Sequence, residues 1–157
     1  MTGIDVRALQ PDDHDAVLAF LRSLSAETMY RRFFSLPRVD DRLYAMVAHP
    51  SECCSEALVA WEGDDVVGLA SYDRLESDPT AADVAIVISD AWQHHGVGST
   101  LMRKLGGAAR RRGIDRFTAT MLADNRPVVD FVRHSNPAAR LHFDGTELAM
   151  EAPLGAA

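Results

Sequence analysis

The segment from Val84 to Leu105 constrains the fold more than any other part of the chain, because it predicts a strand, a tight glycine loop and a helix in direct succession. The apolar run from Asp83 to Ile88 is typical of a strand covered on both faces. The first turn of the following helix has N–H groups without intrahelical acceptors, and its dipole places about half a positive charge there. This arrangement predicts a phosphate-binding site.

The glycine spacing excludes two common phosphate motifs. A dinucleotide-binding loop would place its third glycine at position 101, which is Leu101. A nucleoside triphosphate loop requires a Gly-Lys pair, and the chain contains none. Gly96 and Gly98 can adopt backbone angles closed to other residues and have no side chain to block a close approach, so the amides from Gln93 to Thr100 can converge on a diphosphate.

The remaining pattern, Gln93-x-x-Gly96-x-Gly98 between an apolar strand and an amphipathic helix, resembles the pyrophosphate loop of the GNAT superfamily of N-acetyltransferases, which use acetyl-CoA. The resemblance implies that the diphosphate of CoA binds amides of His94 to Ser99 and that its pantetheine arm pairs with the strand backbone. Asn125 matches the family's pantetheine-binding asparagine, and its position also predicts a helix cap. The residues so assigned to the cofactor are Ile86, Val87, Ile88, Gln93, His94, His95, Gly96, Val97, Gly98, Ser99, Thr100 and Asn125.

The order of the predicted elements resembles the same family over nearly the whole chain. We predict strands at 4–9, 56–62, 66–75, 83–88, 116–122, 140–144 and 147–153, and helices after Pro11, from Ser25, and at 40–47, 98–112 and 126–134. The implied fold is α/β, with a twisted mixed sheet that splays between the strands at Asp83 and Phe117 and flanking helices. Gly106 and Gly107 predict a close contact between a helix and the sheet. Length and composition predict a single domain over residues 1–157.

Charge and composition exclude several partners. The net charge of −7 and pI of about 5.2 argue against binding to nucleic acid or to a membrane surface. Adjacent Cys53 and Cys54 predict reduced, structural thiols, and the scattered histidines predict no metal site. No apolar run approaches the roughly 20 residues of a membrane span, and the amino terminus lacks an export signal, so we expect a cytoplasmic protein.

Acetyl transfer to an amine requires a base, and Asp83 is the candidate. Its position at the end of the apolar strand predicts partial desolvation, which would raise the pKa of the carboxyl group. Relatives that acetylate protein lysines often have Glu here; the shorter Asp83 favours action through a water molecule. Alternatively, Asp83 caps the loop that follows Asp78-Pro79.

Many members of the superfamily protonate the departing thiolate with a tyrosine in the helix after the next strand. The corresponding segment here, from Asn125 to His134, has Phe131 and no tyrosine. We therefore expect either a water molecule to protonate the thiolate or the thiolate to leave unassisted.

The segment from Leu24 to Phe34 resembles the helix before the acceptor groove of bacterial protein lysine acetyltransferases. The resemblance implies that Tyr30 and Arg32 reach the acceptor, whereas Phe33 and Phe34 are expected in the core. The resulting interpretation is an acetyl-CoA-dependent N-acetyltransferase that acetylates protein lysine by direct attack in a ternary complex. The alternatives are a small-molecule amine acetyltransferase and a CoA-binding sensor or scaffold with weakened catalysis. The sequence leaves the oligomeric state open.

Overall fold

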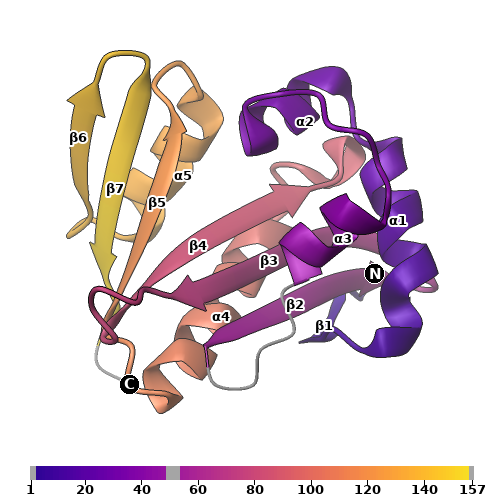
Figure 1. Cartoon of the computed structure of the whole chain (residues 1–157), viewed down its shortest axis with the longest axis horizontal. Helices are drawn as coiled ribbons and strands as arrows, with labels where there is room; N and C mark the ends of the chain where they lie inside the picture. The colour runs from indigo at the N-terminus through magenta and orange to yellow at the C-terminus, as the bar shows by residue number, and fades with distance from the viewer. Residues whose placement is uncertain (1–2, 49–53, 156–157) are drawn as a thin grey trace.

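The computed structural model describes residues 3–48 and 54–155, and its centre is one seven-stranded mixed sheet with the order β1-β2-β3-β4-β5-β7-β6 (Figure 1). All neighbouring strands are antiparallel except β4 and β5, which are parallel. The mixed sheet confirms the predicted α/β class. The strands are β1 (Asp5–Ala8), β2 (Ser55–Glu62), β3 (Asp65–Arg74), β4 (Ala81–Ile88), β5 (Arg116–Leu122), β6 (Arg140–Asp144) and β7 (Glu147–Pro153).

The three helices whose bounds were predicted, at 40–47, 98–112 and 126–134, begin and end within one residue of those bounds. Ser25 caps α2 as its sequence position predicts, because the Ser25 hydroxyl accepts a 3.1 Å hydrogen bond from the Thr28 amide. Beyond the end of α4, Gly113 has φ +85°, a left-handed angle that glycine adopts readily. The helices are α1 (His14–Ser23), α2 (Ala26–Phe33), α3 (Asp41–Ala48), α4 (Val97–Arg111) and α5 (Arg126–Ser135), with 3-10 turns η1 (Pro11–Asp13) and η2 (Asp90–Trp92).

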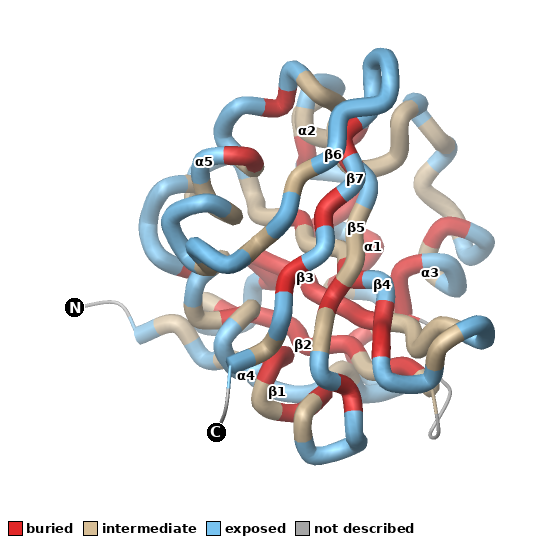
Figure 2. Tube along the Cα trace, turned by 90° about the vertical axis from the view of Figure 1, so that its left-hand side faces the viewer, coloured by how far each residue is buried: buried red, intermediate tan, exposed pale blue. Residues whose placement is uncertain are grey.

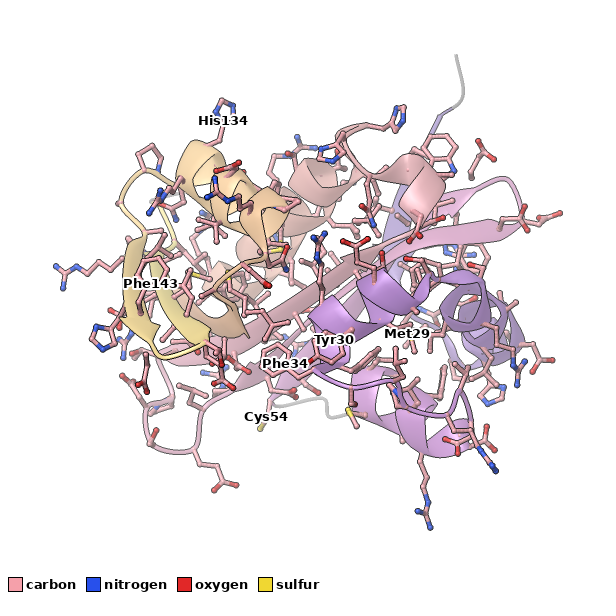
Figure 3. All side chains as sticks on the ribbon, turned by 90° about the horizontal axis from the view of Figure 1, so that it is seen from above. Met29, Tyr30, Phe34, Cys54, His134 and Phe143 are labelled. Atoms are coloured by element: carbon pink, nitrogen blue, oxygen red, sulfur yellow. The ribbon has the colours of Figure 1, made fainter. Side chains whose placement is uncertain are left out.

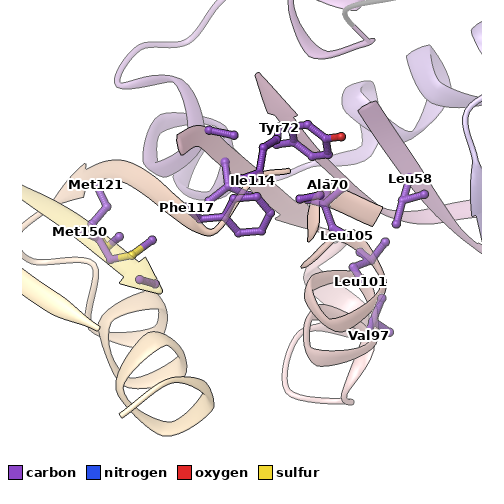
Figure 4. Packing of buried hydrophobic residues seen from close by; sticks show 14 of the residues in the cluster. Leu58, Ala70, Tyr72, Val97, Leu101, Leu105, Ile114, Phe117, Met121 and Met150 are labelled. Atoms are coloured by element: carbon purple, nitrogen blue, oxygen red, sulfur yellow. The ribbon is translucent and has the colours of Figure 1, made fainter. Parts of the chain in front are cut away.

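Helices cover both faces of the sheet, and alternate residues of each strand point to opposite faces. On β2, for example, Val59 packs with α1, α2 and α3, whereas Leu58 packs with α4. Leu101 and Leu105 point from α4 toward the sheet (Figure 4). Buried segments gather on the central strands, whereas β6 at the edge is largely exposed (Figure 2). The central strands are therefore held rigidly between two helical layers.

Strands β4 and β5 are neighbours for three residue pairs, of which the last is Asp83 and Thr118. Beyond this pair the strands diverge, with β5, β7, β6 and α5 on one side and β1 to β4 on the other (Figure 1). The residues of β4 from Val84 to Ile88 pair with β3 alone. The predicted splay between these two strands is thus confirmed.

The close contact between α4 and the sheet occurs at Gly68 of β3. A Cβ atom there would lie 3.0 Å from the Cδ1 atoms of both Ile88 and Leu101, which is too close for ordinary contact. At Gly106 the nearest atom to such a Cβ, on Leu154, is 3.6 Å away, and Gly107 is similarly uncrowded. The prediction that Gly106 and Gly107 mark the close contact was therefore wrong.

Cys54 is disulfide-bonded in the structure, so the prediction of a reduced thiol at this position was wrong. Cys53, His49 and the Pro50-Ser51 segment lie outside the described residues. Within 3–48 and 54–155, no helix combines the length and hydropathy needed to cross a membrane.

Candidate functional site

A pocket of about 510 Å³ lies where β4 and β5 diverge, bounded by α2, the start of α4, and α5. Nine of the residues assigned to the cofactor line it: Ile86, Val87, Ile88, Gln93, His94, Gly96, Gly98, Ser99 and Asn125. Among the described residues, its lining includes Arg31 and Arg32 but no aspartate or glutamate. The pocket is therefore suited to an anionic ligand, although the whole protein is acidic.

The loop before α4 has two residues with left-handed backbone angles. Gly96 has φ +83°, as predicted, and His94 has φ +66°. Gly98 is part of α4 and does not use the left-handed angles that are open to glycine. A Cβ atom on Gly98 would lie 3.7 Å from Ile86 and Phe131. The absence of a side chain at Gly98 keeps this part of the pocket wall open.

The first turn of α4 provides the positive end of a 15-residue helix. Its first N–H groups lack intrahelical acceptors, and no acidic side chain lies in this turn to complement the dipole. Gly98 and Ser99 bring the turn to the pocket surface. A bound diphosphate would supply the missing negative charge at this helix end.

Gln93 connects the loop to α2. Its Nε2 atom donates to the Thr28 hydroxyl and to the Ile88 carbonyl oxygen, both at 3.2 Å. The same Thr28 hydroxyl donates a 2.8 Å hydrogen bond to Asp90, at the start of η2. Thr28 therefore joins α2 to the glycine loop. The sequence analysis missed this role because more than 60 residues separate Thr28 from both partners.

Asn125 supplies a buried, unsatisfied polar atom to the pocket. The residue is 4% exposed, and its Oδ1 atom has no hydrogen-bond partner among the described residues. It occupies the N-cap position of α5 but makes no side-chain capping bond there. Leaving such an acceptor unpaired is costly, so an amide N–H of a bound pantetheine arm would fit this site.

Asp83 lies at the closed end of the gap, between Asp73 of β3 and Thr118 of β5. Partial burial raises the pKa of Asp83, as expected, although the side chain stays exposed on one side. The hydrogen bond from Thr118 lowers this pKa, the negative charge of Asp73 raises it, and the positive charge of Arg32 lowers it.

The loop after Asp78 is held by Asp78 itself, which accepts hydrogen bonds from the Thr80 amide and hydroxyl. The alternative of Asp83 as the loop cap was therefore wrong.

Besides Asp83, four assigned residues lie outside the pocket lining. Val97 is 3% exposed and belongs to the core, and the Thr100 hydroxyl bonds to the Gly96 carbonyl oxygen at 3.1 Å. The His95 ring packs edge-on against Trp92. Tyr30 is 49% exposed and lies beside Phe34 at the end of α2 (Figure 3). The side chains of these four residues do not enter the pocket.

Phe131 lines the pocket on α5, and no tyrosine is among the described lining residues. The described pocket lining therefore offers no phenol hydroxyl that could protonate the departing thiolate. Across residues 3–48 and 54–155, no group of three or more potential metal ligands comes together.

Comparisons with known proteins identify relatives over most of the chain. The chain matches the model of the acetyltransferase (GNAT) family over residues 18–135. It is 32% identical over 122 residues to acetyltransferase Pat of Mycolicibacterium smegmatis. The matched region covers 76% of this chain and 37% of Pat. The chain thus spans little more than a third of that relative.

Solved structures show the same fold. The GNAT domain of PAT from S. lividans is similar with a TM-score of 0.86 and 26% identity, over 95% of this chain and 89% of that domain. YncA from Salmonella typhimurium, whose structure contains acetyl-CoA, has a TM-score of 0.77 at 18% identity, over 98% of this chain and 95% of YncA.

Proposed function

The chain belongs to the GNAT family of acetyl-CoA-dependent acetyltransferases, and from this premise we propose that it acetylates lysine side chains of proteins. The single observation that carries the chemistry is the pocket between β4 and β5, which is lined by arginines and ends beside Asp83. The segment from Leu24 to Phe34, which resembles the helix before the acceptor groove of bacterial protein lysine acetyltransferases, supports a protein acceptor.

Acetyl-CoA, when bound, supplies the activated acetyl group. The chain's own part begins with the diphosphate, which the amides from His94 to Ser99 bind with help from the α4 dipole. The Asn125 Oδ1 atom accepts a hydrogen bond from the pantetheine arm. Backbone groups of Ile86, Val87 and Ile88, which have no β5 partner, hold the arm along the strand.

Asp83 removes a proton from the acceptor amine. A carboxylate with a raised pKa is a stronger base than an ordinary aspartate. Because Asp83 is short and exposed on one side, a water molecule carries the proton between the amine and the carboxylate. With Phe131 in place of a tyrosine, a second water molecule protonates the departing thiolate.

The proposal is tested by following thiol release from acetyl-CoA with lysine peptides, folded proteins and small amines as acceptors. We expect turnover with lysine in a protein or peptide, and we expect Asp83→Asn to lower kcat about 10²–10⁴-fold. The dissociation constant for CoA should not change in this variant, because Asp83 lies outside the pocket lining.

The same assay separates the alternatives. Turnover with small amines alone would indicate that the substrate is a small-molecule amine and not a protein lysine. Tight CoA binding without turnover on any acceptor would identify a sensor. Equal rates for the wild-type protein and Asp83→Asn would remove Asp83 from the mechanism while leaving the acetyltransferase intact.

A further inference from the structure

Arg32 places a positive charge in the pocket without a direct partner among the described residues. Its side chain is partly buried on α2 and lines the pocket, and it packs over the Phe33 ring with 4.6 Å between Cζ and the ring centroid. Within the described residues, its guanidinium makes no hydrogen bond or salt bridge. Burial lowers the pKa of the Arg32 guanidinium, and the negative charge of Asp83 partly opposes this shift.

The neighbouring Arg31 is different. It lines the same pocket, but its Nη2 atom forms a 2.8 Å salt bridge with Glu27 one turn earlier. The charge of Arg31 is thus satisfied within α2, whereas that of Arg32 is not. This difference makes Arg31 the natural control for Arg32.

A partly buried guanidinium with unused N–H groups lacks both water and an acceptor, and this loss is costly. The described lining of the pocket has no aspartate or glutamate, so it offers no anionic acceptor. Asp83 influences Arg32 only through space, without a hydrogen bond. An anion that enters with a substrate would satisfy the guanidinium.

Building on the proposed function, we propose that Arg32 binds a carboxylate brought by a substrate. A guanidinium presents two parallel N–H groups that match the two oxygens of a carboxylate. Arg32 and Asp83 are close enough to influence each other's ionisation, so a substrate can place its carboxylate at Arg32 and its amine near Asp83. A peptide lysine next to an aspartate or glutamate provides both groups, an amine and a carboxylate. A carboxylate at the end of the acyl chain is the other source of the same group.

Two matched substrate pairs distinguish these sources. The acceptor pair is a lysine peptide with aspartate and glutamate beside the lysine and the same peptide with asparagine and glutamine, both with acetyl-CoA. The donor pair is succinyl-CoA and butyryl-CoA, which have four-carbon acyl chains with and without a terminal carboxylate. For each pair, kcat/KM is measured with the wild-type protein, Arg32→Gln, Arg32→Lys and Arg31→Gln.

We expect the wild-type protein to favour the carboxylate member of one pair about tenfold, the effect of one charge-assisted hydrogen-bonded contact. Arg32→Gln should bring this ratio close to one, Arg32→Lys should retain part of it, and Arg31→Gln should leave it unchanged. A preference in the acceptor pair assigns the carboxylate to the amine substrate, and a preference in the donor pair assigns it to the acyl chain.

A ratio near one for both pairs in the wild-type protein would overturn the proposal, as would an unchanged preference in Arg32→Gln. Equilibrium dissociation constants for the same peptides and CoA thioesters provide the same ratios without turnover. If no acceptor is acetylated but Arg32-dependent binding of a carboxylate persists, the proposed function fails and this inference stands. If turnover occurs without any carboxylate preference, this inference fails alone.

Discussion

Thr118 donates a 3.1 Å hydrogen bond from its hydroxyl to Asp83 Oδ1, across the last residue pair that β4 and β5 share. This bond stabilises the charged form of Asp83, whereas burial and the facing Asp73 favour the neutral form. The basicity of the proposed catalytic carboxylate is thus set by the two strands on either side of it.

Removing the Thr118 hydroxyl should raise the pKa of Asp83 further. A base is active when deprotonated, so activity is lost as the pH falls through its pKa, and Thr118→Val should move this loss to higher pH. Asp73→Asn removes a like charge and should move it to lower pH. The profile of kcat/KM against pH measures both shifts. Identical acid limbs in the two variants would contradict this account of Asp83.

Thr28→Val should weaken CoA binding while the fold is retained. The substitution removes the hydroxyl that bonds to Asp90 and Gln93, two contacts that hold the glycine loop. Loss of about 1 kcal/mol of hydrogen bonding predicts a rise of about fivefold in the dissociation constant, measured by calorimetry. Thr28→Ser keeps the hydroxyl and should bind CoA like the wild-type protein. Equal weakening in both variants would show that packing, and not the hydroxyl, is responsible.

Gly96→Ala and Gly98→Ala should have different effects. Alanine at Gly96, where φ is +83°, should lower the free energy of unfolding by about 1–2 kcal/mol. Alanine at Gly98 lies within α4 and should preserve the free energy of unfolding, but its methyl group enters the pocket wall and should weaken CoA binding. Denaturant titration and calorimetry measure the two effects. A Gly98→Ala variant with unchanged CoA affinity would show that the ligand does not approach this turn closely.

Gly107→Ala should stabilise the protein. The position is inside α4, and an added Cβ would meet only the flexible end of Arg111, at 3.6 Å. The gain of about 0.5–1 kcal/mol predicts a rise in Tm of roughly 1–4 °C, measured by calorimetry. Gly113→Ala is the control with the opposite sign, because the left-handed angle there disfavours alanine. A lower Tm for Gly107→Ala would mean that α4 packs more tightly at this point than its neighbours indicate.

Local patterns were sufficient to predict the order and the bounds of the elements. The strands β5, β6 and β7 begin and end at the predicted residues, because their alternating residues and bounding turns lie within a few positions of one another. The glycine loop was located for the same reason. β4 begins at Ala81, two residues before the predicted start, because its first residues pair with β5, which lies more than 30 positions away.

Contacts between distant residues could not be predicted in this way. The bonds of Thr28 to Asp90 and Gln93, and the crowding around Gly68, depend on how α2 and α4 pack against the sheet. The left-handed angle at His94 was not predicted either. The sequence indicated the chemistry of the site, and tertiary packing determined which side chains enter the pocket.

The short pairing between β4 and β5 also affects how easily the two parts of the sheet separate. Among the described residues, three residue pairs join the two parts of the sheet, so a ligand bound between the strands would contact both parts and hold them together. Saturation with such a ligand at 100 times its dissociation constant would add about 2.7 kcal/mol to the free energy of unfolding. Amide hydrogens near the mouth of the gap should then exchange more slowly with solvent.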